Sequence, residues 1–82
     1  MGAVTILYFA SAADRRGCSS ESFSLQSGAT TGHLRSSLAQ AHPALRGTLE
    51  RCRIAVNHEF VGNDWVLKAG DEVAVIPPVS GG

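Results

Sequence analysis

Residues 70–82 have the sequence GDEVAVIPPVSGG, an alternating segment that runs into two prolines, a valine, a serine and two glycines. Within it, residues 72–77, EVAVIP, are predicted to form the last strand of a sheet, because valine and isoleucine favour extended backbone and a glycine-containing turn precedes them. The proline pair ends this strand, since proline has no N–H to donate to a β-ladder. We therefore expect a folded domain over residues 1–76 and an extended tail over residues 77–82.

The composition is that of a small globular protein. Eighty-two residues are enough for one domain, and 44% hydrophobic against 17% charged residues argues against disorder. Seven basic and seven acidic residues give a formal net charge of zero, which lacks the basic surplus of proteins that bind nucleic acids or anionic membranes. No apolar run is long enough to span a bilayer, and the N-terminal segment lacks the positive charges of a signal peptide. We expect a cytoplasmic protein with no nucleic-acid or membrane partner.

Four further strands are predicted before the last one. Residues 3–9, AVTILYF, are apolar on both faces, which favours a central strand or one with a face reserved for a partner. Residues 21–26, ESFSLQ, alternate as a half-buried strand does and form an antiparallel hairpin with the first strand through a loop over residues 10–20. Residues 52–57, CRIAVN, and a short strand around Phe60 complete the sheet.

One main helix is predicted between these strands. It begins at Thr30 or Thr31, since threonine is a favoured N-cap, and it ends near His42, because the residue before Pro43 is pushed out of the helical region. Its inward face carries apolar residues at helical spacing, namely Leu34, Leu38 and Ala41.

A further helical turn within residues 43–51 is expected to bury Leu45 and Leu49. Three residues of the following turn-rich segment are expected to pack inward: Trp65, Val66 and Leu67. A chain of this size has apolar surface for one core, so the helix and the sheet must share it. The predicted fold is an α+β roll, a mixed sheet covered by one main helix.

Residues that could bind a metal or react are few and scattered. Cys18 and Cys52 lie far apart in the sequence, and a cytosolic chain keeps such thiols reduced. The histidines show no spacing typical of metal ligands and are expected to be ordinary surface or edge residues: His33, His42 and His58. There is no nucleophile–base pair and no phosphate-binding loop. We therefore expect no metal, no bound cofactor and no catalytic activity of the chain on its own.

Segments across the whole chain resemble the MoaD family, the small sulfur-carrier subunits of molybdopterin synthase. They are VTILYFA at residues 4–10, AVN at residues 55–57 and GDEVAVIPPVSGG at residues 70–82. A terminal Gly-Gly is shared by all ubiquitin-like proteins and by the thiamine sulfur carrier. The longer motif, PPVSGG after GDEVA, is specific to a much smaller group of proteins. The resemblance implies a β-grasp, or ubiquitin-like, fold. It also implies a sulfur-donating subunit that works with a large subunit, within a heterotetramer, in molybdenum-cofactor biosynthesis.

The tail has chemistry that agrees with this resemblance. A terminal carboxylate is ionised and unreactive toward nucleophiles at neutral pH. Adenylation with ATP, by a separate E1-like activating enzyme, would make it an acyl donor, and sulfur delivered to the acyl-adenylate would leave a thiocarboxylate. We expect Gly82 to carry that group and to donate its sulfur to cyclic pyranopterin monophosphate in the large subunit. If Gly82 is the natural terminus, no protease is needed to expose it.

The tail also has a shape suited to insertion. Six residues span at most about 20 Å, and the two prolines favour a stiff polyproline-like stalk. Val79 would be gripped in an apolar channel, and glycines without a Cβ would pass into a narrow active site. The residues expected to enter the partner before Gly82 are Pro77, Pro78, Val79, Ser80 and Gly81.

An exposed apolar patch beside the tail is expected to dock both partners, and its predicted members are Phe9, Val73, Val75 and Val79. A core position for Phe9 is equally compatible with the sequence. For Asp71 and Glu72 we expect a turn and a strand start, with contact to a basic partner surface as the alternative.

One departure from the family pattern lies after the first strand. The bacterial pattern F-A-x-x-R-E-x-x-G has Ala13 and Asp14 here at its Arg and Glu positions. A partner salt bridge through that arginine would have to be replaced by Arg15 or Arg16, which are otherwise expected to be solvated loop charges.

Three other functions are compatible with the residues. The chain could carry sulfur for another pathway, such as thiamine, cysteine or tRNA thiolation, although the PPVSGG tail argues against this. It could be a ubiquitin-like modifier attached through Gly82 to lysines. It could also be a non-covalent β-grasp interaction module with an incidental tail.

Overall fold

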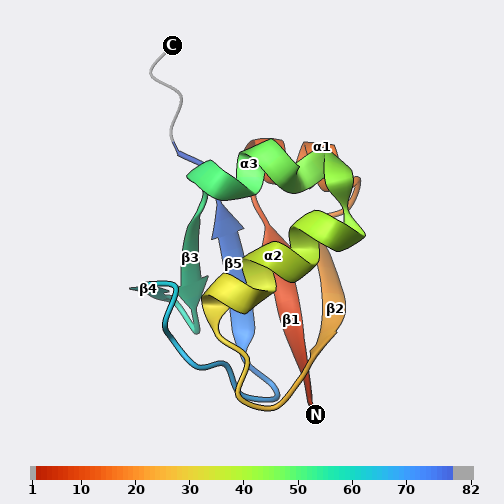
Figure 1. Ribbon diagram of the computed structural model, residues 1–82. Helices are drawn as coiled ribbons and strands as arrows, with labels where there is room; N and C mark the ends of the chain where they lie inside the picture. The colour runs from red at the N-terminus through yellow and green to blue at the C-terminus, as the bar shows by residue number, and fades with distance from the viewer. Residues whose placement is uncertain (1, 79–82) are drawn as a thin grey trace.

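In the computed structural model, which describes residues 2–78, helices cover one face of a mixed five-stranded sheet (Figure 1). The strands are β1 Gly2–Tyr8, β2 Ser20–Leu25, β3 Arg53–Val56, β4 Glu59–Val61 and β5 Glu72–Ile76, in the order β2-β1-β5-β3-β4. The central pair β1 and β5 is parallel, and the other neighbours are antiparallel. The predicted α+β roll is confirmed, and each predicted strand is found within about two residues at either end.

The helical layer contains α1 Ala10–Arg16, α2 Thr31–Ala41, the 3₁₀ turn η1 Pro43–Leu45 and α3 Arg46–Arg51. The longest is α2, the predicted main helix. Its N-cap is Thr30, whose side chain accepts a hydrogen bond from the His33 N–H while the Thr30 N–H donates to His33 Nδ1. The helix ends at Ala41, two residues before Pro43, as predicted. Ala41 itself is exposed and does not face the core.

The core lies between the sheet and this helical layer. On β1 and β5, alternate residues point toward the helices, and the parallel register sets Ile6 beside Val73 and Tyr8 beside Val75. Leucines of the helical layer close the core from above, all at most 2% exposed: Leu34, Leu38, Leu45 and Leu49. Each fully buried aliphatic side chain contributes about 1.5–3 kcal/mol, so this layer holds the helices on the sheet.

The loop predicted over residues 10–20 is wrong in its first half, where the chain forms α1. The segment ASAADRR consists largely of alanine and arginine, which are strong helix formers. Gly17 ends the helix with a φ of 86°, and its N–H donates to the carbonyl of Ala13. Only Ala12 is fully buried, so the helix lacks the apolar periodicity that would have revealed it.

Two of the three residues expected to pack inward after β4 lie on the surface. Trp65 is 49% exposed and Val66 is 52% exposed, whereas Leu67 is buried as predicted. This loop is attached through its backbone, since the Thr31 N–H donates to the Trp65 carbonyl and the Leu67 N–H donates to the Ala29 carbonyl. Those bonds fix the loop without any need to bury the Trp65 ring.

Candidate functional site

The segment before the tail leaves the sheet at a defined place. The central strand β5 ends at Ile76, and Pro77 and Pro78 continue beyond the sheet at the end of the molecule where α1 and α3 lie (Figure 1). The Phe9 N–H donates to the Val75 carbonyl at 3.2 Å, so the end of β1 holds this exit. The remaining predicted tail residues, Val79, Ser80, Gly81 and Gly82, lie outside the described residues.

The apolar patch predicted beside the tail has different members from those expected. Val73 and Val75 are 0% exposed, because odd-numbered residues of β5 point into the core. They therefore cannot offer their side chains to a partner, and that part of the prediction is wrong. Phe9 is 46% exposed, which favours the surface alternative for this residue.

The residues that do face outward belong to the side of the sheet without helices. A row of apolar residues crosses four neighbouring strands there, because Leu7 pairs with Ala74, Ala74 with Ala55, and Ala55 with Phe60. We call these four residues the outer row. Phe60 is 55% exposed, Leu7 and Ala74 are partly exposed, and Ala55 between them is buried, at 6% exposure. The apolar character of both faces of residues 3–9 was the sequence signal for this surface.

At the edge of the outer row, Arg53 holds the ring of Phe60. The guanidinium carbon of Arg53 lies 4.1 Å from the ring centroid, a cation–π contact worth about 0.5–1 kcal/mol at an exposed site. Arg53 is also the register partner of Ile76, the last residue of β5. The contact therefore places a fixed aromatic ring on the outer face, two strands away from β5, which leads into the tail.

A polar network fixes α1 beside this exit. Arg16 donates from Nε and Nη2 to the two carboxylate oxygens of Glu21 at 2.8 Å, and the Tyr8 hydroxyl donates to Glu21 Oε2. Arg16 lowers the pKa of Glu21 to about 2. Burial, with the Glu21 carboxylate, raises the pKa of Tyr8 well above its usual range. His42 Nε2 lies 3.1 Å from the same carboxylate, without hydrogen-bond geometry.

This network corrects two predictions. Arg16 is a helix residue with a bound carboxylate and not a solvated loop charge, so it is unavailable to replace the missing family arginine. Arg15 is exposed and remains available for that role. His42 is not an ordinary surface residue either, since its side chain is only 21% exposed and packs at the end of α2.

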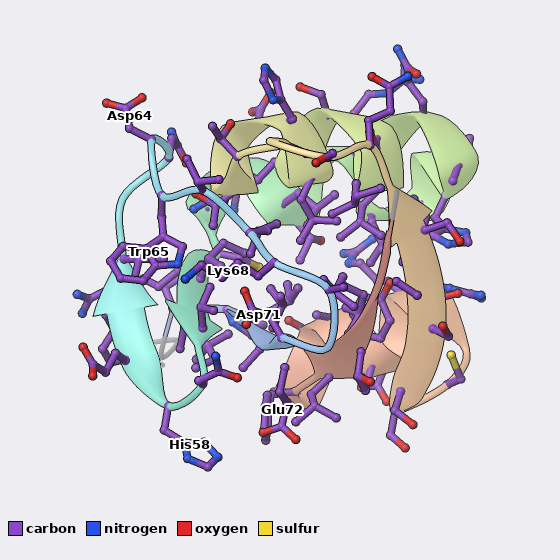
Figure 2. The ribbon with its side chains drawn as sticks, turned by 90° about the horizontal axis from the view of Figure 1, so that it is seen from below. His58, Asp64, Trp65, Lys68, Asp71 and Glu72 are labelled. Atoms are coloured by element: carbon purple, nitrogen blue, oxygen red, sulfur yellow. The ribbon has the colours of Figure 1, made fainter. Side chains whose placement is uncertain are left out.

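At the opposite end of the molecule, hydrogen bonds of Asp71 connect neighbouring loops (Figure 2). Its carboxylate accepts hydrogen bonds from Asn57 Nδ2 at 3.0 Å and from the Lys68 N–H at 2.8 Å. Asn57 in turn accepts from the Glu72 N–H, and Glu72 lies 3.2 Å from the exposed His58 ring. These contacts tie the last loop to the β3–β4 turn, as expected of a turn and a strand start.

Other reactive groups give no second site within residues 2–78. Cys18 and Cys52 are free thiols, and burial raises the pKa of Cys52. In this part of the chain no three His, Cys, Asp or Glu side chains are grouped to hold a metal ion. None of its helices is long and apolar enough to cross a membrane.

Comparison with known proteins gives consistent similarities. Residues 6–82 match the ThiS family. A Chlamydomonas reinhardtii protein named molybdopterin synthase sulfur carrier subunit is 42% identical over 81 residues, covering 96% of this chain and 98% of the relative. The crystal structure of SAMP1 from Haloferax volcanii superposes with a TM-score of 0.89 at 30% identity, covering 99% of this chain and 100% of that one. The match confirms the predicted β-grasp fold.

A fourth similarity is to a chain solved in a complex. The complex of subunits 1 and 2 of molybdopterin-converting factor from Helicobacter pylori contains a chain that superposes with a TM-score of 0.71 at 26% identity. The match covers 98% of this chain and 99% of that one. A structural relative with this fold therefore assembles with a second subunit.

Proposed function

The chain belongs to the ThiS family, and from that premise we propose that it is the sulfur-carrier subunit of molybdopterin synthase in molybdenum-cofactor biosynthesis. The observation that carries this proposal is the 42% identity to a carrier subunit along almost the whole of both chains. The sequence PPVSGG, which follows directly on β5, supports it. The protein is not catalytic by itself and supplies sulfur to a larger enzyme.

The working group of this carrier is the carboxylate of Gly82. An E1-like activating enzyme joins it to the AMP part of ATP and releases pyrophosphate. A sulfur donor then displaces AMP and leaves a thiocarboxylate. In the large subunit this sulfur passes to cyclic pyranopterin monophosphate, and water restores the carboxylate. The carrier itself binds no cofactor, because ATP is used on the activating enzyme.

The fold supports this role at the start of the tail. Pro77 and Pro78 begin the stalk directly after the central strand, so the tail starts from a strand that is paired on both sides. Val79, Ser80 and Gly81 complete the stalk that enters the partner and place Gly82 at its tip. Glycines at the tip keep it slim enough for a narrow channel.

The surface that docks the large subunit is the outer row together with Phe9. Exposed apolar groups next to a reactive tail suit a partner that must enclose the tail, and Phe60 is an aromatic anchor of the kind that carries binding energy. The Helicobacter pylori complex supports assembly with a second subunit. We assign the same face to the activating enzyme, and a cytoplasmic location to the protein.

Mass spectrometry of the C-terminal peptide tests the chemistry. After incubation with the activating enzyme, ATP and a sulfur donor, the peptide is expected to gain the mass difference between sulfur and oxygen. A variant that lacks Gly82 is the control and is expected to show no gain. An unchanged wild-type peptide under conditions that consume ATP would contradict the proposal.

A ubiquitin-like modifier is the second candidate, because the chain superposes well on small archaeal modifier protein 1 from Haloferax volcanii. A modifier would form isopeptide bonds between Gly82 and lysines of many proteins. Digests of total protein from cells that express the chain distinguish the two functions. Gly-Gly remnants on target lysines that vanish in the Gly82 deletion would favour the modifier over the dedicated carrier.

A further inference from the structure

A cleft opens at the root of the tail. It has a volume of about 440 Å³ and lies between α1, α3 and the start of the tail. We call it the tail-root cleft. The residues on which its properties depend are Ser11 and Arg15 of α1, Thr48 and Arg51 of α3, and the two tail prolines, Pro77 and Pro78.

Each helix presents one face to this cleft. Ser11 and Arg15 are four residues apart, and Thr48 and Arg51 are three apart, so each pair lies on one side of its helix. The orientation of α1 is set by Arg16, the residue after Arg15. Arg16 is held by Glu21 on the side of β2, and one helical residue corresponds to about 100° of rotation, which turns Arg15 toward a different side.

The two arginines of the cleft have no acidic partner in the part of the chain that the structure describes. Both are exposed, and neither has a carboxylate within 4.0 Å among residues 2–78. Arg46 also has no carboxylate within 4.0 Å among residues 2–78, whereas three arginines are engaged, the first being Arg16, which Glu21 binds. Arg35 donates to the carbonyls of Leu49 and Cys52, and Arg53 stacks on an aromatic ring.

The charges of the molecule are separated although their sum is zero. Four of its seven acidic residues lie on β4, on the last loop and at the start of β5, away from the helical end: Glu59, Asp64, Asp71 and Glu72. Figure 2 labels the last three of them there. The two acids on the helices of the cleft, Asp14 and Glu50, do not line it. The root of the tail is therefore a positive region on a neutral protein.

We propose that the tail-root cleft binds an acidic segment of the large subunit at the mouth of the channel that receives the tail. This inference rests on the proposed function. The two guanidiniums donate hydrogen bonds to carboxylates of that segment and set the direction in which the tail enters. Beside the hydroxyls of Ser11 and Thr48, the cleft has an apolar wall of Ala44 and the two prolines, against which a peptide chain can pack. That wall favours an acidic peptide segment.

Charge reversal tests the cleft. The affinity of the large subunit is measured by calorimetry for wild type and R15E/R51E, at about 50 mM and about 500 mM salt. The double variant is expected to bind at least about tenfold more weakly at low salt, with a smaller difference at high salt. The matched control is R46E, on the same helix α3 but lining the groove against α2, and it is expected to bind within about twofold of wild type.

A neutral variant, R15Q/R51Q, controls for misfolding caused by charge reversal. It is expected to show a smaller loss of affinity with the same dependence on salt. The proposed role of the cleft would be contradicted if R15E/R51E bound within about twofold of wild type, or if R46E lost as much affinity as R15E/R51E. The proposed function is tested separately by molybdopterin formation at saturating carrier. Normal formation with an unaffected R15E/R51E affinity rejects the cleft alone, whereas no formation with wild type rejects the function.

Discussion

Both faces of the sheet carry apolar residues, but only one face is covered by the protein's own helices (Figure 1). On β1, Ile6 is 0% exposed against the helical layer, while its neighbour Leu7 faces the other way and is partly exposed. On β5, Val73 and Val75 fill the core, while Ala74 lies in the outer row. The comparison teaches that apolar residues serve folding on one face and are free to serve association on the other.

The adjacent pair Ile6 and Leu7 gives the sharpest test of this difference. Ile6→Ala removes packed core volume, and we expect the free energy of unfolding to fall by about 2–5 kcal/mol. Leu7→Ala removes a partly exposed side chain of the same size, and we expect a loss below about 1 kcal/mol. Urea unfolding followed by circular dichroism measures both. Equal losses would show that the outer face is as important to folding as the inner one.

Phe60 tests the association side of the comparison. Phe60→Ala is expected to change the free energy of unfolding by less than about 1 kcal/mol but to weaken binding of the large subunit at least about tenfold, since exposed aromatic anchors carry interface energy. Val66→Ala is a matched control, because Val66 is 52% exposed against 55% for Phe60 but lies outside the outer row. The same loss of affinity in both variants would contradict the proposal that the outer row docks the large subunit.

The inner face ends in the polar network around Glu21, which predicts a dependence on pH. The pKa of Glu21 falls from 4.5 to about 2 on folding, so its stabilisation is complete above about pH 4.5 and is lost as pH falls toward 2. Glu21→Gln is expected to lower the free energy of unfolding at neutral pH by about 1–2 kcal/mol. The stability of this variant is also expected to depend less on pH between 4.5 and about 2. Denaturant unfolding between these pH values measures it. Glu50→Gln, at an exposed site of α3, serves as control, and an identical profile in both variants would contradict the network's role.

The smallest effect is expected at Trp65. Its ring is 49% exposed although tryptophan is usually buried, and the loop around it is held through backbone bonds. Trp65→Ala should therefore lower the free energy of unfolding by less than about 1 kcal/mol, against about 3–5 kcal/mol for a core tryptophan. Thermal or urea unfolding measures the change. A loss of about 3–5 kcal/mol would show that the Trp65 ring stabilises the fold as a core residue does.

The strands and the main helix were predictable from the sequence because local patterns determine them. Alternation marks residues 21–26, and Thr30 and Pro43 mark the ends of α2. The helix α1 was not predictable, since it is seven residues long, buries only Ala12 and starts at Ala10 with a φ of 50°, a conformation that few residues signal.

The candidate site was predictable in its tail but not in its surroundings. The sequence PPVSGG carries its own chemistry, so the tail prediction needed no tertiary structure. Which face of β5 is buried depends on where the helices pack, and the two alternating sets, Val73 with Val75 and Ala74 with Ile76, are both apolar. The tail-root cleft joins residues from three segments far apart in the chain, and no local pattern brings Arg15 and Arg51 together.

The most direct test of the account is a reconstitution with two forms of the same protein. The large subunit and cyclic pyranopterin monophosphate are mixed with carrier that bears either a thiocarboxylate or an ordinary carboxylate at Gly82, and the molybdopterin formed is measured. The account predicts molybdopterin in proportion to the thiocarboxylated carrier and none from the carboxylate form. Equal formation from both forms, or none from the thiocarboxylate, would contradict the claim that Gly82 carries the sulfur.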